Sequence, residues 1–136
     1  MRRIRWLVLA LALSSPAAAQ PFTGGPIPSA TATAALPTST QSRTTLIKGV
    51  AGQYIYVIGW HIIPASGAVV TWSTGTGTNC GTSNVILDGP NTYGTTIAPD
   101  NWGGNVGAVM IVPKGQDLCL TIATAAISGS IVTGQF

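Results

Sequence analysis

The longest run of β-branched and aromatic residues in the chain lies between Gly52 and Pro64 and consists of QYIYVIGWHII. This composition, bounded by glycine and proline, predicts a β-strand over 54–63. Side chains of a strand alternate between two faces, yet both alternate sets are apolar here. The even-numbered set is Tyr54, Tyr56, Ile58, Trp60 and Ile62. We therefore expect a central strand covered on both faces, with a second subunit packed against these five residues.

The chain beyond residue 44 continues as short apolar stretches separated by Gly, Pro and Asn. No stretch shows the 3.6-residue periodicity of an amphipathic helix, and turn signals at this spacing favour a β-sandwich or barrel. We expect strands at 44–50, 54–63, 68–74, 84–88, 92–97, 106–112, 117–123 and 127–136. The predicted fold is all-β: a single antiparallel, jelly-roll-like β-sandwich of about eight strands that occupies residues 44–136.

The first 19 residues have the three parts of a secretory signal peptide: a basic start, an apolar core over 6–13 and an Ala-rich end. The predicted cleavage site follows Ala19. The apolar core is too short to span a bilayer, which takes about 20 residues, so no stable membrane span is expected. Residues 20–43 are rich in Pro, Thr and Ala and are predicted to be a linker or arm. The protein is expected in the periplasm or outside the cell.

The leader contains three of the six basic residues, and the three that remain balance three aspartates. The basic pI of the full chain therefore belongs to the leader. Because the three remaining cations are scattered, they form no stripe that could follow a phosphate backbone, and no nucleic-acid partner is expected. A surface without net charge also opposes self-association only weakly.

The chain has two cysteines, Cys80 and Cys119. In an exported protein a single pair of cysteines predicts a disulfide. The alternatives are a metal site or a catalytic thiol. Structural zinc takes four ligands, and His61 is the only histidine that could assist. We therefore predict a disulfide, no metal and no cofactor.

Candidate catalytic groups are few. The chain has no glutamate, and its three aspartates, Asp88, Asp100 and Asp117, flank turns, where Asp usually closes the turn. A hydrolase would need two of these carboxylates side by side in a cleft. His61 lies inside the most apolar strand, where a histidine is more often packed than catalytic. We predict that the protein is not an enzyme.

One group of residues has the chemistry of a ligand site. Trp102 lies in the Gly-rich stretch PDNWGGN beside Asn101, and Tyr93 precedes that stretch. An exposed tryptophan with Asn and Asp neighbours could stack on a sugar ring, whereas a structural tryptophan would close the end of the sandwich. Trp102, Tyr93 and Asn101 are therefore the candidate ligand-binding residues, with a glycan or cell-surface partner.

The segments GQYIYVIGW, GTGTNCGT, LDGP, KGQDLCLT and the final GQF together resemble a set of jelly-roll β-sandwich proteins of phages and phage-derived bacterial sequences. The resemblance covers residues 44–136. It implies a virion-decoration or tail-associated role and a topology like that of tumour necrosis factor, whose sandwiches pack as trimers. It implies no catalytic residues. A signal peptide is unusual for a virion protein and favours an exported bacterial protein of this fold.

These observations leave three functional hypotheses. The first is an exported, non-enzymatic β-sandwich that acts by assembly or attachment, as a homo-oligomer and, from the resemblance, a trimer. The second is a carbohydrate-binding module. The third is a small outer-membrane barrel, but the residues that alternate with Phe136 include Gly134, Ser130 and Ser128 and would make a poor lipid-facing surface.

Overall fold

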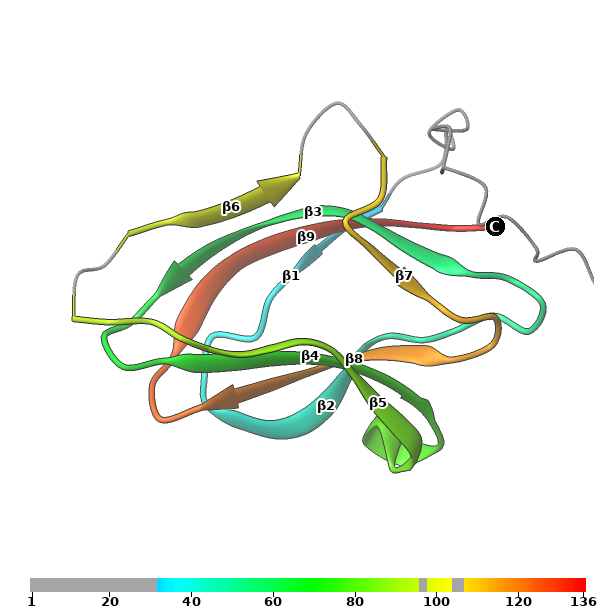
Figure 1. Ribbon diagram of the computed structural model, residues 1–136, viewed down its shortest axis with the longest axis horizontal. Coiled ribbons are helices and arrows are strands. Elements are labelled where there is room, and N and C mark those ends of the chain that lie inside the picture. Colours follow the sequence, from blue (N-terminus) through cyan, green and yellow to red (C-terminus); the bar gives the residue numbers. More distant parts are fainter. Residues whose placement is uncertain (1–31, 96–97, 104–106) are drawn as a thin grey trace, which may run out of the picture.

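The computed structural model describes residues 32–95, 98–103 and 107–136, which form two antiparallel sheets packed face to face (Figure 1). The strands are β1 (Ala32–Ala35), β2 (Gln41–Ile47), β3 (Ile55–Pro64), β4 (Val69–Thr76), β5 (Thr82–Thr92), β6 (Asp100–Gly103), β7 (Met110–Val112), β8 (Asp117–Ala123) and β9 (Ile127–Gln135), with a 3-10 turn η1 (Thr78–Cys80). Sheet A has the order β1-β9-β3-β6, with β7 also pairing with β3. Sheet B has the order β2-β8-β4-β5. The prediction of an all-β sandwich is confirmed.

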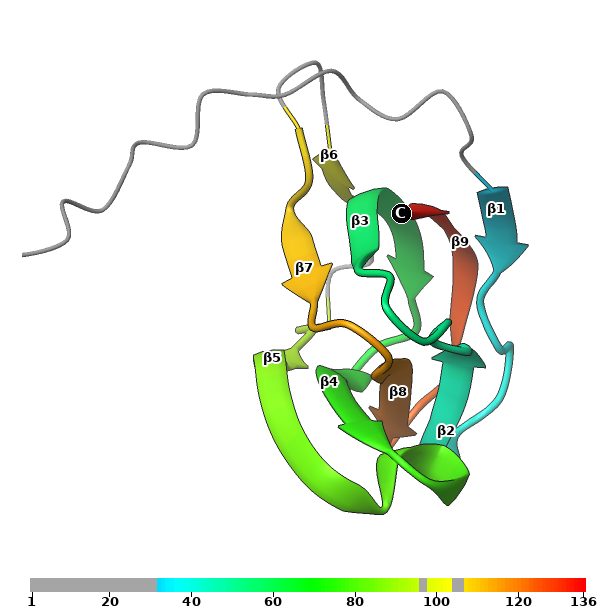
Figure 2. The same cartoon turned by 90° about the vertical axis from the view of Figure 1, so that its right-hand side faces the viewer.

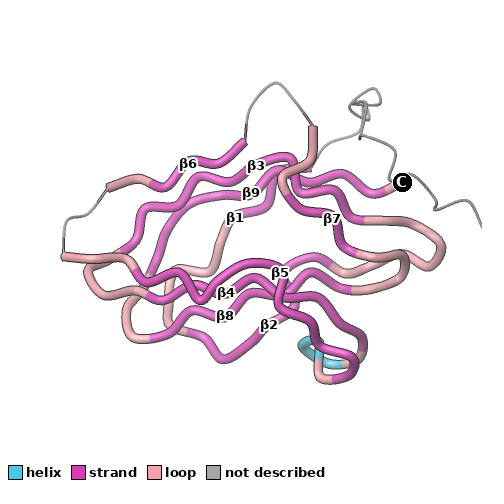
Figure 3. The backbone as a smooth tube through the Cα atoms, viewed as in Figure 1, coloured by secondary structure: helices cyan, strands magenta, loops and turns pink. Residues whose placement is uncertain are grey.

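The two sheets lie one above the other in Figure 3, and the buried apolar side chains of the core lie between them. Its members are apolar side chains at alternate positions along the strands, where they face the opposite sheet. Those that are fully buried include Ile55, Val57, Ile62, Val70, Trp72, Leu118, Leu120, Ile122 and Ile131. Short turns join β3 to β4 and β8 to β9. At both turns the chain passes from one sheet to the other.

The strand β3 contains a β-bulge, and this bulge explains its unusual pattern. Its pairing with β9 shifts register between Val57 and Gly59. Before the bulge the odd-numbered Ile55 and Val57 are buried; after it the even-numbered Trp60 and Ile62 are buried. A bulge adds one residue and so reverses which residues face inward. Both alternate sets are apolar because each supplies the core over half of the strand.

This arrangement corrects the predicted oligomer interface. Trp60 and Ile62 belong to the core of their own subunit, where they are 8% and 0% exposed. They therefore contribute nothing to an outer face. Of the five predicted residues, Tyr54, Tyr56 and Ile58 remain on the outer side of sheet A, and they stay candidates for an interface.

The sandwich also begins earlier than predicted. β1 pairs with β9 within sheet A, and β2 starts at Gln41 and pairs with β8 in sheet B. Both strands fall partly or wholly in the stretch 20–43 that the sequence predicts to be a linker or arm. Thr and Ala give β1 no clear apolar alternation, and its place is set by hydrogen bonds to β9. The predicted signal peptide and residues 20–31 lie outside the described residues.

The other main differences concern β5 and β6. β5 continues through Gly89 and Pro90 to Thr92, whereas a stop at Asp88 and a new strand at 92–97 are predicted. Asp100–Gly103 forms the strand β6 and not a loop. The first strand lies beside the last, and β2 lies beside β8. This nesting favours the jelly-roll topology, which stays a prediction.

The predicted disulfide is confirmed. Cys80 in η1 is bonded to Cys119 in β8, across 39 residues of sequence. Both cysteines are fully buried. The bond joins the turn between β4 and β5 to the strand β8 of the same sheet. In this turn, the carbonyl oxygen of Asn79 accepts a hydrogen bond from Nε of Arg43.

Candidate functional site

A cleft of about 460 Å³ opens along one side of the sandwich. It lies between the edge strand β5 of sheet B and the strands β6 and β7 of sheet A, which Figure 2 shows on the same side of the molecule. β1 and β2 are on the opposite side. The residues that line the cleft are Trp60, Leu87, Asp88, Asn91, Tyr93, Asp100, Trp102, Val109 and Met110. Its volume is within the range of small-molecule sites.

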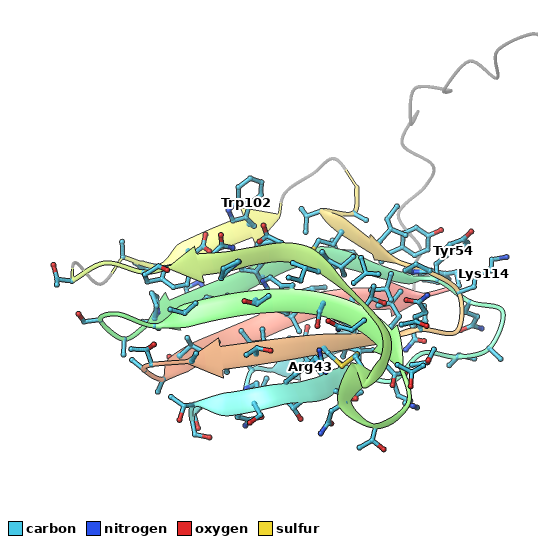
Figure 4. The ribbon with its side chains drawn as sticks, turned by 60° about the horizontal axis from the view of Figure 1, so that its bottom comes forward. Arg43, Tyr54, Trp102 and Lys114 are labelled. Atoms are coloured by element: carbon cyan, nitrogen blue, oxygen red, sulfur yellow. A yellow bond between two sulfur atoms is a disulfide. The ribbon has the colours of Figure 1, made fainter. Side chains whose placement is uncertain are left out.

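A row of three tryptophans leads from the core to the rim of this cleft. Trp60 on β3 has its ring centroid 5.5 Å from that of Trp72 on β4 and 6.0 Å from that of Trp102 on β6. Trp72 is 1% exposed, Trp60 is 8% exposed and Trp102 is 60% exposed. Register sets this order, because Trp60 and Trp102 are directly opposite each other in adjacent strands and so share a face. The outermost indole is thus held by packing while it remains open to solvent (Figure 4).

The carboxylate of Asp100 is fixed in the cleft by two donors. The hydroxyl of Tyr93 donates to its Oδ2 at 2.6 Å, and the indole N–H of Trp60 approaches the same oxygen at 3.4 Å. Burial raises the pKa of Tyr93, and the hydrogen bond to Asp100 and the charges of Asp100 and Asp88 raise it further. Tyr93 therefore remains a neutral donor throughout the physiological range.

A second carboxylate comes from β5. Asp88 Oδ2 accepts a 2.8 Å hydrogen bond from the side-chain N–H of Asn91. Residues three apart in a regular strand would face opposite sides, but the pairing of β4 with β5 shifts register here: Val70 is opposite Asn91 and Trp72 is opposite Asp88. This bulge turns both side chains toward the cleft. β-Bulges are frequent beside functional sites because they re-aim side chains in this way.

The structure brings two of the three predicted ligand residues together. Trp102 and Tyr93 both line the cleft, but Asn101 does not. Asn101 is adjacent to Trp102 on β6 and faces the other side of sheet A, where its side-chain oxygen is hydrogen-bonded to Nδ1 of His61. Asn101 therefore lies outside the cleft that Trp102 and Tyr93 line, because neighbouring residues on a strand point to opposite faces.

Sequence reasoning missed Asp88, Asn91, Asp100 and Trp60 as site residues. The sequence places the aspartates at turns and predicts no cleft that two carboxylates share. The only local signal was the presence of Asp and Asn on either side of Gly89-Pro90, and nothing in the sequence placed β5 opposite β6. These side chains come from different sheets, and only the packing of the sheets brings them together.

A second feature lies at the other end of sheet A. The rings of Tyr54 and Tyr56 are 6.0 Å apart, and those of Tyr56 and Phe136 are 6.1 Å apart. The ammonium of Lys114 lies 5.1 Å from the centre of the Tyr54 ring, and Figure 4 shows these two side chains together, far from Trp102. Ile111 is opposite Tyr56 on β7 and is 39% exposed. We call Tyr54, Tyr56, Ile58, Ile111 and Phe136 the outer aromatic surface.

Comparison of the chain with protein-family models, curated proteins and solved structures finds no match. Over residues 32–95, 98–103 and 107–136, no helix has the length and apolar character needed to cross a membrane. Within the same ranges no three or more His, Cys, Asp or Glu side chains gather in a way that could hold a metal ion. The site must therefore be interpreted from its own geometry.

Proposed function

We propose that the protein is an exported, non-catalytic β-sandwich module that attaches to its target by binding a saccharide in the cleft between β5 and β6. The observation that carries this proposal is the exposed indole of Trp102, held in place by Trp60 beside two fixed carboxylates. It joins attachment, the first functional hypothesis from the sequence, with carbohydrate binding, the second.

The exposed indole supports a stacking role. Burying a large apolar side chain contributes roughly 1.5–3 kcal/mol, and Trp102 leaves most of this unused because 60% of it is exposed. A sugar presents a flat face of C–H groups that can cover an indole, and its hydroxyls remain at the edge of the ring. Because Trp60 already restricts the indole, little conformational entropy would be lost on binding.

The polar groups of the cleft support recognition of hydroxyls. Asp88 and Asp100 each have one carboxylate oxygen occupied by a neighbouring donor, Asn91 for the first and Tyr93 for the second. These bonds fix the orientation of the carboxylates before a ligand arrives. A carboxylate that accepts a hydrogen bond from a hydroxyl makes a charge-assisted contact about twice as strong as a neutral one.

The disulfide supports export. Disulfides persist in oxidising compartments such as the periplasm and the cell exterior and are rare in the cytosol. The Cys80–Cys119 bond is consistent with the predicted signal peptide.

A glycan array followed by calorimetry with the best ligand tests the proposed function. We expect binding by the mature protein and at least about a tenfold loss in Trp102→Ala, which removes the stacking surface. Tyr54→Ala is the matched control, because it removes an exposed aromatic side chain far from the cleft. The proposal is wrong if no soluble or insoluble glycan binds, or if both variants bind equally. Hydrolysis of a bound oligosaccharide would overturn the non-catalytic part alone.

A second function, self-assembly, is favoured by the outer aromatic surface. Tyr54, Ile111 and Phe136 are each between 37% and 39% exposed and lie next to one another across β3, β7 and the end of β9. Exposed apolar clusters of this kind commonly mark interfaces. We infer that a second copy of the chain covers this surface, and the resemblance to trimeric sandwiches favours a closed trimer, which would use up the surface without forming fibres.

Light scattering on the purified mature protein tests assembly. We expect an oligomer at micromolar concentration that Tyr56→Asp dissociates, because a buried carboxylate without a partner is costly. Thr78→Asp, on the exposed turn η1, is the control that adds the same charge elsewhere. A monomer at all concentrations would exclude this second function and leave saccharide binding unaffected.

A further inference from the structure

We propose that the cleft selects saccharides that carry a protonated amine, that is, hexosamines with a free amino group, over neutral saccharides, and that it rejects acidic ones. This inference rests on the proposed function, since it names the ligand class of the same site. It is carried by the way in which the few charges of the chain are distributed around the fold.

The cations of the sandwich are all engaged away from the cleft. Lys48 pairs with Asp117 at 2.8 Å, Arg43 donates to the carbonyl of Asn79, and Lys114 lies over Tyr54. None of the described residues that line the cleft is basic. The segments 96–97 and 104–106, which flank β6 in sequence, contain no charged residue. Among the residues that the structure describes, the cleft therefore has two carboxylates and no positive charge to balance them.

Both carboxylates belong to residues that line the cleft, and each has one oxygen to which no described group donates a hydrogen bond. Within the described part of the chain, hydrogen bonds occupy Oδ2 of Asp88 and Oδ2 of Asp100, and neither Oδ1 accepts one. A protonated amine has three N–H donors and no acceptor, so it matches such oxygens. A hydroxyl can also donate to them, but without the attraction between opposite charges.

The indole adds to this preference. A cation near the face of tryptophan is attracted by the negative charge of the ring face. An amino group on a sugar stacked against Trp102 would lie close to both the indole and the carboxylates. A uronic or sialic acid would place a third negative charge in a cleft that already contains two, and like charges repel one another.

The experiment uses matched pairs of ligands. Each neutral hexose or N-acetylhexosamine oligosaccharide is printed on an array beside its free-amine counterpart, in both gluco and galacto configurations. Uronic acid oligosaccharides are included, and binding is measured at pH 6. We expect the free amine to bind at least about threefold tighter than its neutral counterpart in the preferred configuration, the scale of one or two exposed ion pairs. The preference should shrink toward unity in about 1 M NaCl, where charges are strongly screened.

Two isosteric variants and one control locate the effect. Asp88→Asn and Asp100→Asn keep the acceptor that Asn91 or Tyr93 uses but remove the charge. Each should weaken the binding of the amine more than the binding of its neutral counterpart, and so lower the ratio of amine to neutral affinity. Lys114→Gln makes the protein more negative at a site far from the cleft. It should leave the ratio unchanged, whereas a general attraction of cations to an acidic protein would raise it.

The outcomes separate the two proposals. Neutral saccharides that bind as well as their amines, or acidic saccharides that bind best, would overturn the preference for amines and leave saccharide binding standing. A ratio that survives in both asparagine variants would also overturn it. The absence of binding to every member of every pair would overturn the proposed function together with this inference.

Discussion

The indole rings of Trp60 and Trp102 lie 6.0 Å apart and within 27° of parallel, although the first is 8% exposed and the second 60% exposed. Trp60 in turn packs on Trp72 in the opposite sheet. A side chain of the rim is thereby connected to the core through a row of ring contacts, in addition to the pairing of β6 with β3. Since aromatic pairs of this kind each contribute about 0.5–1.5 kcal/mol beyond their buried area, the position of Trp102 depends on the packing between the sheets.

The close approach of β3 and β6 at Gly59 gives the first prediction. A Cβ at Gly59 would lie 2.5 Å from the carbonyl oxygen of Trp102 and 2.9 Å from Cα of Gly103. Gly59→Ala should push β6 away from β3, lower the free energy of unfolding by about 1–3 kcal/mol and weaken saccharide binding. Urea unfolding and calorimetry measure the two effects.

Gly94→Ala is the control for that substitution, because a Cβ there meets nothing within 4 Å. It should leave stability and binding nearly unchanged. If Gly59→Ala is equally silent, β6 does not depend on contact with β3, and the account of how Trp102 is positioned is wrong.

Tyr93 gives a prediction about alkaline pH. Its pKa is raised by burial first, then by the hydrogen bond to Asp100 and by the nearby carboxylate charges. In the unfolded chain a tyrosine ionises near pH 10. The folded state therefore keeps a proton that the unfolded state loses, so this contribution to stability is complete below about pH 10 and declines as the pH rises further.

Absorbance at 295 nm follows this titration. Of the three tyrosines in the chain, Tyr93 should ionise last, and Tyr93→Phe should remove the latest phase. The same variant should make stability less dependent on pH above about 10. A latest phase that persists in Tyr93→Phe would show that the hydrogen bond to Asp100 does not restrain this hydroxyl.

Asp117 should be important for stability and not for binding. Its carboxylate is 2% exposed and accepts hydrogen bonds from the backbone N–H of Gly49 at 2.9 Å and from Nζ of Lys48 at 2.8 Å. Asp117→Ala removes the acceptor of both donors and should cost about 1–3 kcal/mol in urea unfolding.

Lys48→Gln provides the comparison, because the Lys48 side chain is 74% exposed and its ion pair is screened by water. It should cost less than about 1 kcal/mol. Equal losses in the two variants would mean that the ion pair, and not the hydrogen bond to Gly49, is the main contribution of Asp117.

The disulfide gives the fourth prediction. Closing a loop across 39 residues corresponds to about 4 kcal/mol in the chain-entropy model. In urea unfolding, the double variant Cys80→Ala/Cys119→Ala should lose about this amount of unfolding free energy. A reducing agent should destabilise the native protein and have no effect on the variant. Saccharide binding below the unfolding transition should persist, because the disulfide lies in sheet B away from the residues that line the cleft.

Local composition is enough to predict the class of fold and the disulfide. Short apolar stretches separated by turn residues limit the backbone to strands, and a single pair of cysteines in a chain with a predicted leader predicts one bond. Both inferences depend on local composition and on parity, which do not require knowledge of which strands are neighbours. For Trp102 the sequence leaves two interpretations open, an exposed residue that stacks on a ligand and a structural residue that closes the end of the sandwich.

The tertiary structure alone decided which apolar residues face inward and which polar residues share a site. The bulge in β3 exchanges the buried set between Val57 and Trp60, so strict alternation assigned Trp60 and Ile62 to the wrong face. The arm predicted at 20–43 contains β1, which pairs with β9. The sequence of β1 has no apolar alternation that would indicate this strand. Asp88 and Asp100 come together because β5 and β6 are edge strands of different sheets on the same side. Register and sheet packing depend on contacts between residues far apart in the sequence, so a local sequence pattern does not predict them.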